Sequence, residues 1–66
     1  MSTITLNGNA HETSACTVGE LLQELGFDQK PVVIEHNKNA LLKDEHERTP
    51  LNNGDSLEVV ILAAGG

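Results

Sequence analysis

The sequence is poor in aromatic residues, cysteine and positive charge. Phe27 is the single aromatic residue and Cys16 the single cysteine among 66 residues. Aromatic platforms for stacking single-stranded nucleic acid are therefore missing, and one cysteine cannot form an intramolecular disulfide. Ten acidic residues against four lysine and arginine residues give a formal net charge of −6, which phosphate backbones repel. We expect no nucleic-acid partner and a fold that depends on an aliphatic core.

Long apolar runs and metal-ligand spacing are missing as well. No run approaches the roughly 20 apolar residues that span a membrane, and residues 1–4 lack the features of a signal peptide. We therefore expect a cytoplasmic protein with no membrane partner. His11, His36 and His46 share no ligand spacing, which predicts surface histidines and no metal site. A chain this short forms one domain and has no room for a deep catalytic cleft.

Alternating apolar residues and tight-turn signals predict several short strands. The predicted strands span residues 3–7, 10–15, 31–36, 40–42 and 56–62. Turns are expected at Asn7-Gly8-Asn9, at Asn37-Lys38-Asn39 and over residues 52–55. In the last strand, one face carries Leu57, Val59 and Ile61, and the other carries Glu58, Val60 and Leu62.

A short amphipathic helix is predicted between the two hairpins. Thr17 and Glu20 fit a capping box, in which the Thr17 hydroxyl accepts from the Glu20 N–H and the Glu20 carboxylate accepts from the Thr17 N–H. Gly26 is suited to the left-handed conformation that ends a helix. The apolar stripe, which we expect to pack on the sheet face with Ile4 and Leu6, consists of Val18, Leu21, Leu22 and Leu25.

These elements predict the order ββαββ and an α+β fold of two layers. The sheet is expected to have four to five strands, with one main helix packed on one face. Residues 43–48 are polar and predict a turn or one loose helical turn before Thr49-Pro50. The domain is assigned to residues 1–62, and the Ala-Ala-Gly-Gly segment at 63–66 is expected to be a flexible C-terminal tail.

The two last glycines are the strongest functional signal. Gly65 and Gly66 end a short Ala-Ala-Gly-Gly segment that follows directly on an apolar strand. Because glycine has no Cβ, such a pair can lie extended in a slot too narrow for other residues and bring an α-carboxylate to a partner's reaction centre. We identify Gly66 as the candidate reactive residue, with Gly65 and Ala64 giving access. The alternative is an ordinary frayed end.

Taken together, these features resemble the ThiS family, the ubiquitin-like β-grasp sulfur carriers of thiamine biosynthesis. The resemblance covers nearly the whole chain and implies a mixed sheet. Its residues are Asn7-Gly8, Thr17-Val18, Glu20-Leu21-Leu22, Asn37, Gly54-Asp55 and Gly65-Gly66. The chain departs from the family at Leu42, Lys43 and His46, which replace a Val-Pro-Arg-like stretch and a tryptophan. The short length favours the thiamine branch over the related small subunit of molybdopterin synthase.

The resemblance implies a protein cosubstrate and not an enzyme. A ThiF-type, E1-like adenylyltransferase would use ATP to adenylylate Gly66, and a persulfide donor would then convert it to a thiocarboxylate. A ThiG-type thiazole synthase would accept the sulfur. The chain itself would bind no cofactor and carry no catalytic residue. We expect the exposed face of the last strand, with Val60 and Leu62, to be the docking patch for these partners.

Other interpretations stay open. The chain could carry sulfur for molybdopterin or another pathway, act as a ubiquitin-like modifier, or be a plain β-grasp interaction module. Val60 and Leu62 could pack under a loop. Cys16 could carry a persulfide, although a semi-buried structural role is the simpler expectation. Capping and solvation explain Glu20 and Glu24 better than acid–base chemistry does.

Overall fold

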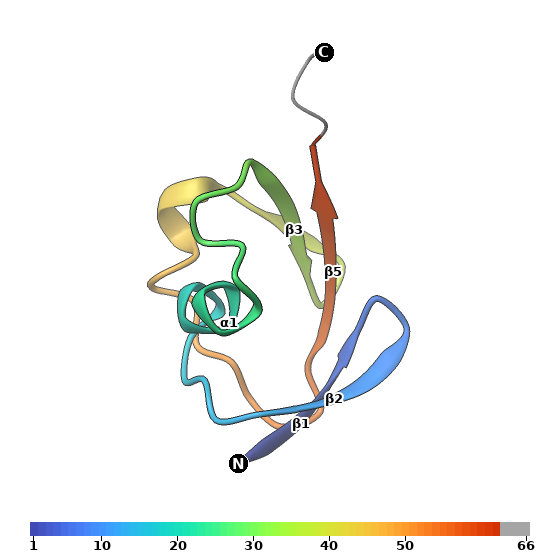
Figure 1. The fold of residues 1–66 in the computed structure, drawn as a ribbon. Coiled ribbons are helices and arrows are strands. Elements are labelled where there is room, and N and C mark those ends of the chain that lie inside the picture. The colour runs from blue at the N-terminus through green and yellow to red at the C-terminus, as the bar shows by residue number, and fades with distance from the viewer. Residues whose placement is uncertain (63–66) are drawn as a thin grey trace.

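One five-stranded sheet and one α-helix form the part of the chain that the computed structural model describes, residues 1–62 (Figure 1). The elements, in chain order, are β1 (Ser2–Leu6), β2 (Asn9–Thr13), α1 (Val18–Leu25), β3 (Val32–His36), β4 (Asn39–Leu41), the 3-10 helix η1 (Lys43–Glu45) and β5 (Ser56–Ile61). Within residues 1–62, no helix has the length and apolar character needed to cross a membrane.

The sheet is mixed, and its last strand lies in the middle. The spatial order is β2-β1-β5-β3-β4, with β5 parallel to β1 and antiparallel to β3. Both hairpins are antiparallel. Their strands β2 and β4 form the two edges of the sheet. The prediction of four to five strands is confirmed with five. The order ββαββ is incomplete, because it counts the two hairpins and omits β5.

Both hairpins turn through two residues with positive φ. These are Asn7 (φ 50°) and Gly8 (φ 85°) in the first, and Asn37 (φ 50°) and Lys38 (φ 72°) in the second. Positive φ at both central residues marks the type I′ turn, whose twist matches that of the flanking strands. The predicted turns are confirmed. Because a two-residue turn pairs Asn9 directly with Leu6, β2 starts and ends earlier than predicted.

Local hydrogen bonds define both ends of the helix. The Thr17 hydroxyl accepts from the Glu20 N–H at 3.1 Å, as predicted. The reciprocal bond differs, because the Glu20 side chain reaches one residue further and accepts from the Cys16 N–H at 2.8 Å. At the other end Gly26 is left-handed, and the Phe27 N–H donates to the Leu22 carbonyl at 2.8 Å. This last bond belongs to a Schellman motif.

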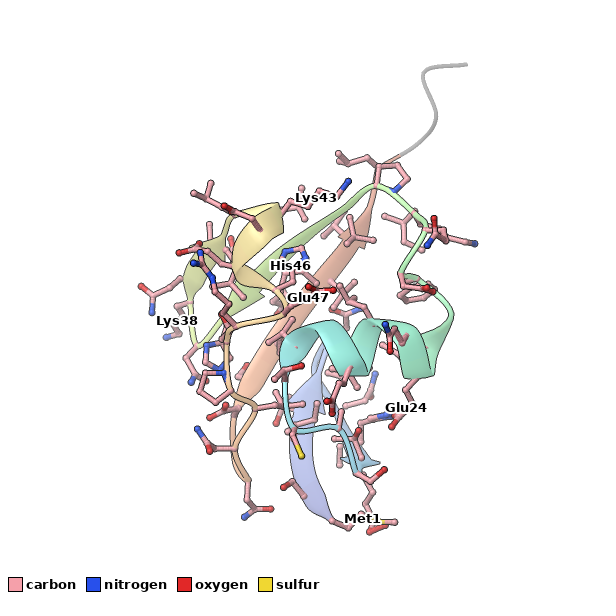
Figure 2. The ribbon with its side chains drawn as sticks, turned by 90° about the vertical axis from the view of Figure 1, so that its left-hand side faces the viewer. Met1, Glu24, Lys38, Lys43, His46 and Glu47 are labelled. Atoms are coloured by element: carbon pink, nitrogen blue, oxygen red, sulfur yellow. The ribbon has the colours of Figure 1, made fainter. Side chains whose placement is uncertain are left out.

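The core lies between α1 and one face of the sheet, as Figure 2 shows with α1 in front of the strands. Leu6 and Leu25 are partly buried at its margin. The predicted packing of the helical stripe is confirmed, but the covered face extends beyond β1 to β3 and β5. The buried apolar residues are Ile4, Val18, Leu21, Leu22, Ile34, Leu51, Leu57 and Val59.

The loop after η1 packs tightly on the first turn of α1. The Gly19 N–H donates to the His46 carbonyl at 2.8 Å. A Cβ added at Gly19 would lie 3.0 Å from the Glu47 Cα, which is backbone and cannot rotate away. Gly19 therefore suits the close approach of helix and loop, although glycine weakens the interior of a helix.

We expect Leu22→Ala to lower the free energy of unfolding by about 2 to 5 kcal/mol, because it removes buried methyl groups and leaves a cavity. Urea unfolding monitored by circular dichroism measures this. Leu42→Ala is the matched control, since Leu42 is exposed and its truncation should leave the unfolding midpoint nearly unchanged. Equal effects of the two substitutions would contradict this description of the core.

Gly19→Ala tests the packing of the loop on the helix. Helix propensity alone predicts a gain of about 1 kcal/mol, but contact of the new Cβ with Glu47 should reverse its sign. We expect a net loss of stability in urea unfolding. Gln23→Ala, at an exposed position of the same helix, should be neutral or slightly stabilising. A stabilised Gly19→Ala variant would show that the loop moves aside without cost.

Candidate functional site

The candidate site is the C-terminal end of β5 together with the sheet face that α1 leaves open. Leu57 and Val59 face the core, so Val60 lies on the opposite face, where 55 % of it is exposed. Val60 pairs directly with Val33 of β3, which is 43 % exposed. An exposed apolar pair therefore lies at the centre of the open face.

Leu62 borders a different surface. It follows the last residue of β5, and its N–H donates to the Pro31 carbonyl at 2.8 Å. It is 48 % exposed and lines a cavity of about 210 Å³ on the helix side, together with Phe27 and Val32. Val60 does not line this cavity, so the two predicted docking residues differ in their surroundings.

The predicted reactive segment lies beyond this point. Gly66, Gly65 and Ala64, and the tail predicted over residues 63–66, lie outside the described residues. What the structure describes is the strand that leads to them. Strand β5 enters the sheet at Ser56 and is bound to neighbours on both sides.

Two turn asparagines hold β5 by their side chains. The Asn7 Oδ1 accepts from the Val59 N–H at 2.7 Å, and its Nδ2 donates to the Val59 carbonyl at 3.2 Å. The Asn37 Oδ1 accepts from the Ser56 N–H at 2.8 Å. Each amide replaces a backbone partner at a place where the neighbouring strand has already turned away. Sequence reasoning identified both residues only as turn formers.

Asp55 fixes the turn that precedes β5. Its carboxylate accepts from the Asn52 N–H at 2.9 Å and from the Asn37 Nδ2 at 3.2 Å, and it lies 2.8 Å from the His36 Nε2. Burial alone would raise the pKa of Asp55, but these bonds, that of His36 foremost, outweigh it and hold the pKa below its usual range. His36 therefore belongs to a half-buried ion pair when it is protonated.

Glu24 connects the helix to the first hairpin. It accepts from the buried Thr13 hydroxyl at 2.7 Å and lies 3.1 Å from the His11 Nε2. Hydrogen bonding to His11, followed by that to Thr13, lowers the pKa of Glu24. Glu24 is exposed, and beyond the solvation that was expected its carboxylate also bonds to two residues of β2, which the sequence did not indicate. Figure 2 shows Glu24 near the C-terminal half of α1.

Two further expectations are corrected. Cys16 is exposed and not semi-buried, because its backbone carbonyl binds the Leu51 N–H while its side chain faces outward. His46 is buried, with 7 % exposed, because η1 and the loop after it fold back against α1. Within residues 1–62, its Nε2 atom has no hydrogen-bond partner. No sequence period marks this burial, since His46 lies in irregular backbone.

His46 also lines a groove of about 550 Å³ between α1 and η1. Acidic and basic side chains share its walls, among them Asp28, Asp44, Lys43 and Glu47. In the described part of the chain, no three histidine, cysteine or acidic residues gather closely enough to hold a metal ion.

The architecture is that of a known class. The crystal structure of the thiamine biosynthesis protein ThiS from Geobacter metallireducens superimposes with a TM-score of 0.81 and 28 % identity, over 97 % of this chain and 99 % of that chain. A solution structure of a thiamine biosynthesis protein from the same organism gives a TM-score of 0.78, again at 28 % identity, over 97 % of this chain and 87 % of that chain. The fold is the ubiquitin-like β-grasp.

Sequence comparison then gives the family. The model of the ThiS family matches residues 4–66. The sulfur carrier protein ThiS of Thermus thermophilus is 39 % identical over 61 residues, which cover 92 % of this chain and 95 % of that protein. This chain belongs to the ThiS family.

A second kind of relative is much longer. A thiazole synthase of Paramagnetospirillum magneticum is 38 % identical over 64 residues, which cover 96 % of this chain. A thiazole synthase of Magnetococcus marinus matches over the same number of residues at the same identity. The chain spans about a fifth of the length of each of these two proteins.

Acid titration tests the Asp55 interactions. Because the folded-state pKa lies below the unfolded value of about 3.9, the stabilisation is present above that value and is lost as pH falls through the folded pKa. Asp55→Asn should therefore be less stable than the parent at neutral pH, and the difference should shrink as pH falls below about 4. Urea unfolding across pH measures it, with Asp28→Asn as the exposed control. A difference that does not depend on pH would contradict the assignment.

Proposed function

We propose that this chain is a sulfur carrier for the thiazole ring of thiamine, with the sulfur held as a thiocarboxylate on Gly66. Membership in the ThiS family, with a match of nearly full length to a sulfur carrier protein, is the observation that carries the proposal. The thiazole synthases that contain a similar segment support a ThiG-type enzyme as the acceptor, because a carrier and its acceptor gain from being joined in one polypeptide.

The chemistry requires activation, because a carboxylate is a poor electrophile. A ThiF-type adenylyltransferase would join the Gly66 carboxylate to the α-phosphate of ATP and release pyrophosphate. The terminal sulfur of a persulfide donor then attacks the acyl carbon, and AMP leaves. Cleavage of the resulting S–S bond by a thiol leaves the thiocarboxylate. Every bond-making group belongs to a partner, so the chain acts as a cosubstrate.

The described residues suit this role. The C-terminal end of β5 is bound on one side by the Asn7 side chain and on the other by β3, so the segment that follows starts from a fixed place. The pair Val33 and Val60 offers exposed apolar surface beside that start. We propose this pair as the docking patch for the activating enzyme, with Leu62 contributing from the helix side.

Changes at the tail should separate function from folding. Deletion of Gly66, or addition of one residue after it, should abolish thiocarboxylate formation, because the reacting atoms must approach within about 3 to 3.5 Å of each other. Gly65→Val should also fail, because its side chain would block a narrow slot. The chain is expressed with its adenylyltransferase and sulfur donor, and whole-protein mass spectrometry measures the product.

The control is the melting temperature, which these tail variants should share with the parent because they leave residues 1–62 unchanged. A thiocarboxylate on the extended chain, formed without trimming, would contradict the proposal. Mass spectrometry also separates the remaining alternatives. An adduct to target lysines would identify a protein modifier, and an unmodified parent chain would favour a plain interaction module.

A further inference from the structure

Two carboxylates face each other on the open side of the sheet. Glu35 of β3 and Glu58 of β5 are paired directly across the strands, next to the pair of Val33 and Val60. Side chains two residues apart in a strand point to the same face, so both pairs lie on the face that α1 does not cover. All four residues are exposed.

Within residues 1–62, nothing compensates this pair. Neither carboxylate takes part in an ion pair, and the two ion pairs of the described residues involve Glu24 and Asp55 instead. Like charges directly opposite each other destabilise a sheet. A domain this small is only marginally stable. The repulsion between Glu35 and Glu58 therefore lowers the free energy of unfolding of the isolated domain.

We propose that Glu35 and Glu58 together bind a guanidinium or ammonium group of a partner protein, while Val33 and Val60 contact apolar surface beside it. The planar fork of an arginine can bridge two carboxylates, which makes a guanidinium the better match. The formal net charge of −6 favours a basic partner surface. This inference rests on the proposed function in one respect, because it takes the activating enzyme as that partner.

The pairing predicts opposite effects on stability and on binding. Replacing both carboxylates by amides of the same shape, Glu35→Gln with Glu58→Gln, removes the repulsion and should leave the domain at least as stable as the parent. The same double variant should bind the ThiF-type adenylyltransferase roughly tenfold more weakly at low salt. The difference should narrow as salt rises.

The experiment measures binding to the purified adenylyltransferase without ATP, by biolayer interferometry at several salt concentrations. Glu12→Gln is the single-charge control, since Glu12 is an exposed acid on the edge strand β2, and it is compared with Glu58→Gln alone. It changes the net charge by one but should leave affinity nearly unchanged. Lys substitution at Glu58 should weaken binding further. Urea unfolding of every variant provides the stability readout.

Each outcome decides between the two proposals. Parent-like affinity of the double variant, or an equal loss in Glu12→Gln, overturns the inference while the sulfur-carrier proposal stands. A clear loss of affinity in the double variant alone supports the inference. If the enzyme binds the parent but never adenylylates it, the proposed function is overturned while the inference stands. No binding of the parent overturns both. A double variant less stable than the parent removes the premise that the pair is a cost.

Discussion

Strand β5 is the last element of the sequence but the central strand of the sheet, so both of its edges must be bound by segments made much earlier. Its backbone pairing to β1 involves only two residue pairs, Thr5 with Ser56 and Leu6 with Leu57. Beyond them β1 turns away, and the Asn7 side chain supplies both a donor and an acceptor to Val59. On the other edge, β3 pairs along five residues. A central strand without these partners would bury unsatisfied polar backbone.

The two faces of β5 have different roles, one in the core and one at the surface. Leu57 and Val59 contribute to the core under α1, and the burial of such side chains stabilises a domain by about 1.5 to 3 kcal/mol each. Glu58 and Val60 do not contribute to the core, because α1 covers only the other face of the sheet. The open face can therefore vary in charge and shape without loss of the core. That face is thus available for partner recognition.

Local features could be predicted from the sequence, while features that join distant segments could not. The Asn-Gly turn, the Thr17 cap and the left-handed Gly26 each depend on a few neighbouring residues, and all three are as predicted. Burial of His46 and the bonds of Glu24 depend on which distant segments meet in space, and no local pattern in the sequence shows this. The same holds for the candidate site. The exposure of Val60 follows from the alternation along β5, whereas the place of Leu62 beside a cavity lined by Phe27 and Val32 could not be predicted.

The proposed function sets a geometric problem, because the chain must deliver a terminal group to the reaction centre of an enzyme. The position of that group depends on where β5 is held relative to the enzyme. In the proposed complex, contacts at Val60 and Glu58 act on β5 itself, and contacts at Val33 and Glu35 act on β3, its hydrogen-bonded neighbour. If the activating enzyme binds there as proposed, these contacts would fix the position and direction of β5 relative to that enzyme. Part of the binding free energy would then serve to place the reacting group, which is how proximity accelerates a reaction between two proteins.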